Sequence, residues 1–422
     1  MWNFRGLLSG ILRYARTPIA AKEDDIAVMN QDLDEHVQDL KAQGLGAYKY
    51  LQLPFREDRC QFTTALDDGP FIDALRWEAG RCNLVLQPFI TTEPALALVR
   101  SVPGMTLAAS RLNLVEEMND KAGAWELFKD LHIERSPGAI CASQNDIERA
   151  ARDLKGKGVR NVVLKDPSPY IASGKSKLGE MRVDGNDQQF ALGLLSLKSS
   201  YQQFRGKKRV ILEQWWEAVE TSPSIVGNIT AEGKTELIAM TEQLMEPDDK
   251  TEYRGSVIPA GSHKVDPEDL PDMFRIYQLV ANKLVKRGWI GVFGIDFIIV
   301  RHQGKRLVIP TEINGRYTGS MYLVNIMRRL GIEDWVGFSS NIRLPLNTSY
   351  SCLRTAIELV EDRNKARIIP LNVGPLAYGK ATIAVLIRPH VAHAVAYAEG
   401  VCKEIRDILS VPRSRQYYEL SA

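Results

Sequence analysis

Two carboxylates and an amide in the middle of the chain could together hold a divalent cation. Asp296 interrupts one apolar run, Glu312 and Asn314 end a second, and the polar connection between the runs contains Gly304. This pattern is typical of a β-hairpin. Because side chains alternate along a strand, Glu312 and Asn314 share one face, and a turn centred on Gly304 places Asp296 directly opposite Glu312.

Directly opposed like charges destabilise a hairpin, since their Cβ atoms are about 5 Å apart. We therefore expect a positive charge between Asp296 and Glu312. Carboxylate and amide oxygens are hard ligands that suit Mg²⁺ bridging the phosphates of a nucleotide, with Mn²⁺ as the alternative ion. Arg316, two residues beyond Asn314, could direct a planar guanidinium at the same phosphates. The alternative is a set of ordinary polar residues on a solvated face, but an unpaired carboxylate within an apolar run is costly.

Two lysines stand at the ends of predicted elements. Lys121 lies in the first turn of a helix whose N-cap is Asn119 or Asp120. A cation is unfavourable at that end of a helix, so a bound anion would explain it, and a solvated surface lysine is the alternative. Lys165 ends a β-branched run at 161–165, which predicts a strand.

The segment after Lys165 could cradle phosphate groups. Its candidate contacts are Ser173, Gly174, Lys175, Ser176 and Lys177. Glycine lets backbone amides approach phosphate oxygens, and the lysines add positive charge. The Walker A pattern is absent, and an ordinary surface loop is the alternative.

A predicted strand at 209–213 runs directly into a polar and aromatic segment. The residues that follow it are Gln214, Trp215, Trp216 and Glu217. The edge of such a strand beside aromatic rings can hold a purine, and Glu213 or Glu217 could accept hydrogen bonds from its amine or from ribose hydroxyls. In the alternative the tryptophans are core residues at a domain junction, and both interpretations can hold together.

Arg254 lies in a predicted polar loop at 241–261. It is our candidate for binding a substrate carboxylate through two parallel hydrogen bonds. Residues 317–320, just after the hairpin, could present backbone amides to the same carboxylate. The alternative is that Arg254 is an ordinary arginine on the protein surface.

Helices and strands alternate before residue 112. The sequence predicts a helix at 24–44, strands at 47–54, 83–89 and 105–109, and a helix at 94–100. This alternation favours an α/β domain with a partly parallel sheet, and the lack of GxGxxG argues against a dinucleotide site. Further along, the sequence predicts helices at 188–197, 266–287 and 322–330 and strands at 224–230, 235–240 and 381–387.

Composition argues against several classes of protein. The 422 residues carry a net charge of +2 and no basic block, so we expect no nucleic acid partner. Five scattered cysteines without a CxxC pair predict neither a disulfide framework nor a zinc site, and they favour the reducing cytoplasm. No apolar run reaches the roughly 20 residues of a membrane span. Residues 1–21 form a basic amphipathic segment that could lie on a membrane or a partner; the alternative is that it packs on its own domain or is disordered.

Taken in order, these motifs resemble the ATP-grasp superfamily. They are residues 119–121, Lys165, the loop 173–181, the segment 213–217, Asp296, and the E-x-N-x-R of Glu312, Asn314 and Arg316. The resemblance covers about 112–320. It implies a nucleotide clamped between two α+β lobes, with Lys121 and Lys165 on phosphates, residues 213–216 on adenine and Glu217 on the ribose. It also implies that Asp296, Glu312 and Asn314 carry Mg²⁺, whereas the serines and lysines of the loop depart from the family's all-glycine form.

The expected fold class is therefore α/β and α+β, an ATP-grasp fold preceded by a pre-ATP-grasp α/β domain. The implied divisions are 1–111 for the N-terminal domain, 112–137 for a linker helix region, 138–212 for a mobile lid and 213–422 for the catalytic domain.

The function that the resemblance implies is an ADP-forming carboxylate–amine ligase acting on small molecules, with amino acids or small peptides as substrates. Arg316, Arg254 and Lys177 are its candidate catalytic residues. A phosphotransferase and a nucleotide-binding regulatory module without turnover are the alternatives, and a homodimer is left open.

Overall fold

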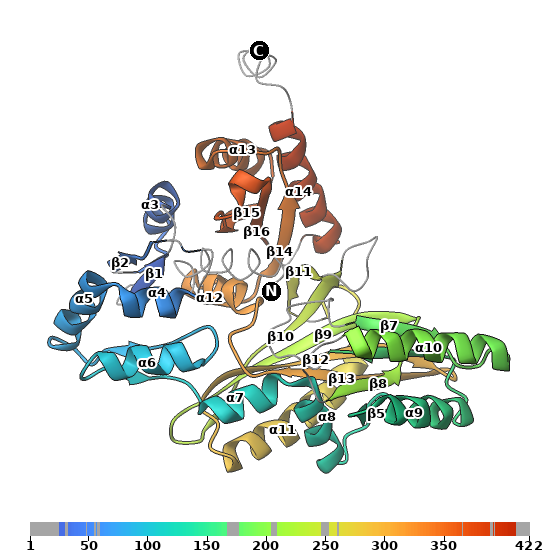
Figure 1. Ribbon diagram of the computed structural model, residues 1–422. Helices are drawn as coiled ribbons and strands as arrows, with labels where there is room; N and C mark the ends of the chain where they lie inside the picture. The colour runs from blue at the N-terminus through green and yellow to red at the C-terminus, as the bar shows by residue number, and fades with distance from the viewer. Residues whose placement is uncertain are drawn as a thin grey trace.

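An antiparallel sheet of eight strands runs through the centre of the molecule (Figure 1). The computed structural model describes residues 25–410 except 30–32, 48, 55, 57–59, 167–176, 204–208, 246–252, 260, 365, 389–390 and 392. The spatial order of the strands is β13-β12-β9-β10-β11-β14-β16-β15. Their bounds are β9 (Val219–Ile229), β10 (Thr235–Met245), β11 (Tyr253–Ile258), β12 (Gly291–His302), β13 (Lys305–Asn314), β14 (Val336–Arg343), β15 (Ala366–Asn372) and β16 (Lys380–Ile387).

One group of helices buries the apolar face of β9, β12 and β13. The helices are α7 (Leu112–Asn119), α8 (Lys121–Asp130) and α11 (Leu270–Lys286), the last preceded by the short η2 (Pro267–Asp269). On β12 the odd-numbered side chains from Phe293 to Ile299 are buried in this core. Because side chains alternate along a strand, Asp296 and Ile298 point to the opposite face.

A second group of helices covers both faces of the sheet's other half. They are α12 (Met321–Arg329), α13 (Tyr350–Arg363) and α14 (Ala394–Ser410), with the short η3 (Leu376–Tyr378). On β16, Ile383 and Val385 pack with α13 and α14, whereas Ala384 and Leu386 pack with α12. Covering on both faces explains why β16 is apolar along nearly its whole length.

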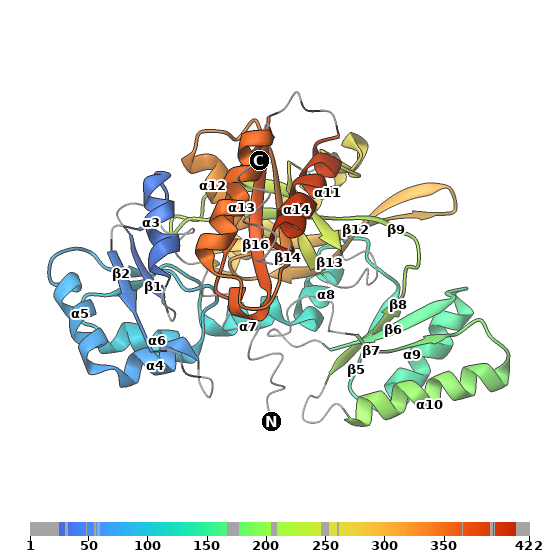
Figure 2. The same ribbon diagram turned by 90° about the horizontal axis from the view of Figure 1, so that it is seen from above.

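A smaller sheet of four antiparallel strands has its own core and lies beside the large one (Figure 2). Its spatial order is β5-β8-β6-β7. Its elements are β5 (Gly138–Cys141), α9 (Gln144–Gly156), β6 (Asn161–Lys165), β7 (Lys177–Arg182), α10 (Asp187–Gln203) and β8 (Val210–Gln214).

The N-terminal part lies on the other side of the large sheet from this smaller one (Figures 1 and 2). It has two pairs of parallel strands, as predicted for a partly parallel sheet. Its elements are β1 (Ile26–Met29), α3 (Asp34–Ala42), β2 (Lys49–Gln52), α4 (Gln61–Asp67), α5 (Gly69–Ala79), β3 (Val85–Leu86), α6 (Glu93–Ser101) and β4 (Thr106–Leu107). Within the described ranges, every helix is too short or too polar to cross a lipid bilayer.

Three of the predicted elements are wrong in part. The helix predicted at 24–44 begins only at Asp34, because Ile26–Met29 pairs with β2 instead. The loop predicted at 241–261 is partly strand: 241–245 continues β10 and Tyr253–Ile258 is β11, and their polar side chains concealed the strand pattern. The loop predicted from Lys177 is also a strand, β7.

The other predicted helices and strands are confirmed as elements, with bounds that shift by a few residues. The amphipathic segment 1–21 lies outside the described residues.

Candidate active site

The hairpin of β12 and β13 closes through Gln303 and Gly304, which both have a positive φ (50° and 79°). A two-residue turn of this kind matches the twist of antiparallel strands, and glycine adopts positive φ at no steric cost. The predicted centre on Gly304 is wrong, because the centre lies between the two residues. This turn alone would pair Asp296 with Thr311.

A β-bulge at Thr311 restores the predicted pairing. Asp296 pairs with Glu312 and Phe297 with Pro310, so Thr311 is the extra residue of β13. Its Oγ1 donates to the carbonyl oxygen of Asp296 at 3.1 Å. One extra residue exchanges the faces of all residues beyond it, and Glu312 thereby joins Asp296 on one face. The prediction that the two carboxylates oppose each other is confirmed.

Neighbouring groups shift the pKa values of the two carboxylates in opposite directions. Asn314 Nδ2 donates to Asp296 Oδ2 at 2.9 Å and to Glu312 Oε1 at 3.4 Å. Lys121 Nζ lies 2.9 Å from Glu312 Oε2. Burial and the charge of Glu312 raise the pKa of Asp296. Burial also favours the neutral form of Glu312, but Lys121 and Arg316 outweigh it and lower the pKa of Glu312.

Lys121 opens α8 directly after its N-cap. Asp120 Oδ1 accepts from the backbone N–H of Ala122 at 2.9 Å, which satisfies one of the free amides of the first turn. The side chain of Lys121 is only 14% exposed. The alternative of a solvated surface lysine is therefore wrong, and the anion beside this lysine is Glu312.

Strands β6 and β7 bring two further lysines together, since Lys165 pairs with Lys177 in the ladder. Lys165 Nζ donates to Glu213, which is buried on β8. Lys177 Nζ lies 2.6 Å from Glu180 Oε2 and 5.0 Å from the ring centre of Trp215. The remaining loop candidates lie outside the described residues: Ser173, Gly174, Lys175 and Ser176.

The residues that follow β8 make side-chain contacts with other elements of the fold. Trp216 Nε1 donates to Ser136 Oγ at 3.0 Å, and its ring meets His302 edge-on. Glu217 Oε1 accepts from Asn161 Nδ2 at 2.7 Å. Trp216 thus packs at a junction between elements, as the structural alternative predicts.

A cavity of about 620 Å³ opens between the two sheets, a volume typical of small-molecule sites. The predicted residues that line it are Lys121, Lys165, Lys177, Glu213, Gln214, Trp215, Trp216, Glu217, Arg254 and Glu312. Asp296 and Asn314 contact Glu312 beside this lining. The fold therefore gathers residues that are up to 191 positions apart in the sequence, from Lys121 to Glu312, around one space.

Solved structures share this arrangement of sheets around a cavity. A biotin carboxylase–β,γ-ATP complex from Campylobacter jejuni matches with a TM-score of 0.60 at 11% identity, over 98% of this chain and 94% of that chain. The ADP complex of PurK, an N5-carboxyaminoimidazole ribonucleotide synthetase, gives 0.58 at 12% identity, over 94% and 95%. Both are ATP-grasp enzymes. This chain has the ATP-grasp fold.

A third ATP-grasp structure is the biotin carboxylase domain of 2-oxoglutarate carboxylase from Hydrogenobacter thermophilus, a dimer solved with MgADP, ADP and bicarbonate. It matches with a TM-score of 0.55 at 13% identity, over 91% of this chain and 84% of that chain. No protein-family model matches the sequence. No curated protein matches it at a significant level either, so structure rather than sequence similarity establishes the ATP-grasp fold.

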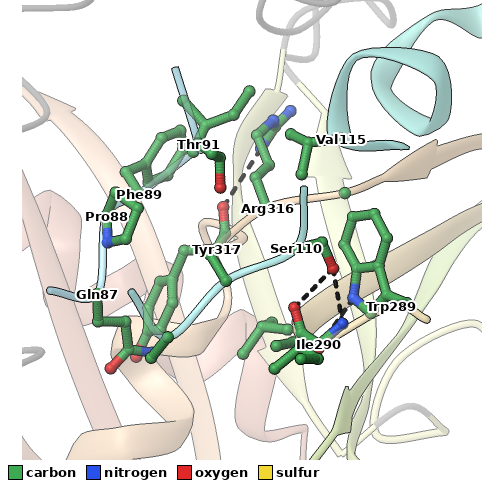
Figure 3. A pocket seen from close by; sticks show the side chains of 16 residues that line it. Gln87, Pro88, Phe89, Thr91, Ser110, Val115, Trp289, Ile290, Arg316 and Tyr317 are labelled. Carbon is green, nitrogen blue, oxygen red and sulfur yellow. Dashed lines mark hydrogen bonds between the residues drawn. The ribbon is translucent and has the colours of Figure 1, made fainter. Parts of the chain in front are cut away.

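Arg316 of the ATP-grasp hairpin borders a second, much smaller pocket of about 30 Å³ (Figure 3). Its Nη1 donates to the carbonyl oxygen of Tyr317 at 3.4 Å, and its guanidinium lies 5.5 Å from the ring centre of Phe89. Burial lowers the pKa of Arg316, and the charges of Glu312 and Asp296 oppose this shift. Arg316 is not among the described residues that line the larger cavity, so its contact with phosphates stays a prediction.

Gly315 lets this end of the hairpin pack closely against α7. A Cβ at Gly315 would lie 2.6 Å from the ring of Trp289, so the close approach requires glycine. Asn119 is buried at the end of α7 and donates from Nδ2 to the carbonyl oxygen of Gly315 at 3.0 Å. Asn119 therefore holds the end of the hairpin beside Lys121, a positioning role that the sequence analysis did not assign to it.

Strands β9 and β10 supply polar partners of Asp296 that the sequence analysis did not assign. Hydrogen bonds from Ser224 and Gln243 reach Asp296 and partly counter the rise of its pKa. If the strand predicted at 235–240 had been continued by a few residues, Gln243 would have been predicted as part of it. The polar character of this segment led to the prediction of a loop instead.

Glu242 is buried beside the same ATP-grasp cavity. It accepts from Thr221 Oγ1 at 2.5 Å and from the backbone N–H groups of Lys264 at 3.0 Å and Val265 at 3.3 Å. These bonds hold the segment before η2 against β10. Because they depend on tertiary contacts, no spacing in the sequence predicts them.

Proposed function

We propose that this chain is an ATP-dependent ligase that activates a carboxylate as an acyl phosphate and joins it to an amine, with release of ADP and phosphate. The observation that carries the proposal is the meeting, around one cavity, of lysines from α8, β6 and β7 with Glu312, which stands opposite Asp296. Such a set suits a polyphosphate and its metal ion. The ATP-grasp structures solved with β,γ-ATP, ADP or MgADP support it.

The hairpin residues fit Mg²⁺, with Mn²⁺ as the alternative ion. Asp296 and Glu312 are hard oxygen donors on one face, and their repulsion contributes to the raised pKa of Asp296. Asn314 would add its amide oxygen after a rotation of the amide group. In the described part of the chain no group of three His, Cys, Asp or Glu side chains forms a metal site, so phosphate oxygens would complete the coordination. The ion, when bound, would neutralise phosphate charge.

The lysines would exchange their carboxylate partners for the nucleotide. Lys121 now pairs with Glu312 and Lys165 with Glu213, so both ammonium groups are already positioned and partly desolvated. We assign them, with Lys177 and the segment 173–176, to the phosphates. The adenine would lie against Trp215 and the backbone of 213–216, with Glu217 near the ribose.

We propose that the chain is divided into the domains that the ATP-grasp resemblance implies. They are an N-terminal domain at 1–111, a linker helix region at 112–137, a lid at 138–212 and a catalytic domain at 213–422. The four-stranded sheet would close over the nucleotide as the lid. Closure would keep water away from the acyl phosphate, which water would otherwise hydrolyse.

The reaction would have two steps. A carboxylate oxygen attacks the γ-phosphorus and the bond to the β,γ-bridging oxygen breaks, which gives an acyl phosphate and ADP. The amine loses a proton to solvent, and its neutral nitrogen then attacks the acyl carbon. Phosphate leaves with the bridging oxygen and takes up the proton that the nitrogen releases as the amide forms. Lys121, Lys165, Lys177 and Arg316 offset the charge in the first step, and Arg254 holds a substrate carboxylate. Neither step requires a nucleophilic side chain of the protein.

For the substrates we propose amino acids or small peptides, supported by the position of Arg254 in the cavity. The bicarbonate in the 2-oxoglutarate carboxylase structure makes bicarbonate a second acid to test. The dimer in that structure supports a homodimer, which light scattering on the purified chain tests. A phosphotransferase is the second candidate function, because the same cavity would suit phosphoryl transfer to a stable acceptor.

The experiment is to incubate the chain with ATP, Mg²⁺ and pools of amino acids, short carboxylic acids or bicarbonate, and to follow nucleotides, free phosphate and product masses together. ADP, phosphate and a product equal to two substrates less water would support the ligase. ADP with a phosphorylated product and no free phosphate would favour the phosphotransferase. AMP and pyrophosphate would overturn both, and binding of ATP without turnover would favour the regulatory module.

A further inference from the structure

Arg254 and Glu399 form an ion pair at the edge of the cavity. Arg254 Nη2 donates to Glu399 Oε1 at 2.5 Å, and both residues line the cavity. Among the described residues from β14 to α14, Glu399 is the only one that lines it. The C-terminal part of the chain thus contributes a single charged side chain to this space, and nothing in the proposed phosphoryl transfer uses it.

A second β-bulge directs Arg254 into the cavity. Met245 pairs with Tyr253 and Leu244 with Gly255, so Arg254 is the extra residue of β11. Bulges commonly redirect a side chain toward a functional site. A Cβ at Gly255 would lie 1.8 Å from a backbone oxygen of β14, so the strand is held tightly directly after Arg254. The backbone that carries the guanidinium is therefore fixed.

The guanidinium is only partly satisfied. Arg254 Nε is buried and has no hydrogen-bond partner among the described residues. An unpaired buried donor is costly, and such a group calls for an acceptor beyond those that the described residues supply. A carboxylate is the acceptor whose geometry matches two guanidinium donors at once.

Glu399 is held by its helix but keeps room for a second partner. Its neighbours Ala398 and Cys402 are 0% and 4% exposed in the core under α14, so the helix cannot rotate away. The side chain of Glu399 is nevertheless 44% exposed. The cavity therefore presents a positive and a negative group side by side, both accessible to a ligand.

We infer that the Arg254–Glu399 pair recognises the amine substrate as an α-amino acid, with its carboxylate on Arg254 and its ammonium group on Glu399. The inference rests on the proposed ligase function and names the class of its amine substrate. A simple acid would meet repulsion from Glu399, and a simple amine would meet repulsion from Arg254. Only a ligand that carries both charges satisfies both partners. The ion pair that the two side chains form with each other keeps both charges compensated.

Calorimetric binding to the full chain tests this assignment. The probes are the twenty common L-amino acids one at a time, with Mg²⁺ and a non-hydrolysable ATP analogue, followed by the N-acetyl and decarboxylated forms of the tightest binder. We expect Glu399→Gln and Arg254→Met to weaken that binder at least tenfold, and each modified form to bind the wild type at least tenfold more weakly. Glu404→Gln is the matched control, because Glu404 lies on the same helix but pairs with Arg363 at 3.4 Å.

A purely structural ion pair gives a different result. Glu399→Gln would then lower the melting temperature while amino-acid binding stayed at the wild-type level, and this outcome would overturn the inference. Binding of the N-acetyl form as tightly as the free amino acid, or binding of no amino acid by the wild type, would overturn it as well. Ligation of amines that carry no carboxylate would leave the ligase function standing and refute the inference alone. Amino-acid binding that depends on both residues, without any ADP formation, would support the recognition site and refute the ligase.

Discussion

Lys121 Nζ lies 2.9 Å from Glu312 Oε2, although the lysine begins α8 and the glutamate lies near the end of β13. Their side chains are only 14% and 27% exposed, so the ion pair is partly desolvated. Removing one partner of such a pair leaves the other charge uncompensated. The pair therefore links the stability of the ligand-free protein to the residues that we assign to phosphate and metal.

Lys121→Met should lower the free energy of unfolding by about 2 kcal/mol, because Glu312 loses its cation while it remains beside Asp296. Urea denaturation at neutral pH without metal measures the change. Lys129→Met, at an exposed site in the last turn of the same helix, is the control and should stay within about 0.5 kcal/mol of the wild type. Equal losses in both variants would contradict the role of the pair.

Asp296→Asn should stabilise the metal-free protein at pH 8 by about 1 kcal/mol and reduce turnover at least a hundredfold. Burial and Glu312 raise the pKa of Asp296 to about 7, so the folded state binds a proton that the unfolded chain releases near pH 4. The free energy of unfolding therefore falls as pH rises from about 4 to 7, and the asparagine removes this fall. Denaturation at several pH values measures the change in stability, and the ATP assay measures the loss of turnover. An asparagine variant less stable than the wild type at pH 8 would contradict the repulsion between Asp296 and Glu312.

The hairpin shows how much of the site the sequence could predict. A turn centre assumed at Gly304 placed Asp296 opposite Glu312, and the structure has this pairing. The route to it was not predictable, because the turn lies between Gln303 and Gly304 and the bulge at Thr311 depends on tertiary contacts. The predicted pairing was correct because the shift of the turn and the extra residue Thr311 cancel each other.

Other parts of the site had no signal in the sequence. Glu242 and Gln243 near the end of β10 line a cavity, and their polar character alone was typical of a loop. Glu399 lies on a C-terminal helix without any motif, and only the packing of α14 against the sheet brings it to Arg254. The fold class, in contrast, was predictable, because ordered motifs and alternating apolar patterns extend over hundreds of residues.

His36 should make the folded state sensitive to acid. It is 1% exposed, its Nε2 donates to the carbonyl oxygen of Pro370 at 3.0 Å, and burial lowers its pKa to about 4. Below pH 6.5 the unfolded chain binds a proton at His36 that the folded chain does not, so the free energy of unfolding falls as pH falls toward 4, by up to about 1.4 kcal/mol per pH unit. His36→Gln cannot titrate and should remove this part of the slope in denaturation curves. An unchanged slope would show that His36 binds its proton equally in the folded and unfolded chain, and would contradict the lowered pKa.

Trp215 should report nucleotide binding, because Lys177 Nζ lies 5.0 Å from its ring centre. A nucleotide that takes Lys177 away and covers the ring changes the surroundings of the indole. We expect ADP with Mg²⁺ to change tryptophan fluorescence in the wild type, and Trp215→Phe to lose most of that change and to bind ADP about tenfold more weakly. Trp77→Phe, on α5 of the N-terminal part, should keep the full response. A full response in Trp215→Phe would exclude Trp215 from the nucleotide site.

The most direct test of the central claim follows the oxygen atoms of the acid. Once the acid substrate is known, the ligation is run with ¹⁸O in both oxygens of its carboxylate, and the released phosphate is examined by mass spectrometry. An acyl phosphate intermediate transfers one labelled oxygen to phosphate in every turnover, because the acyl carbon–oxygen bond breaks when the amine attacks. Labelled phosphate in equal amount to the product is the result we predict. Phosphate without label, formed together with the amide product, would contradict activation of the carboxylate by ATP.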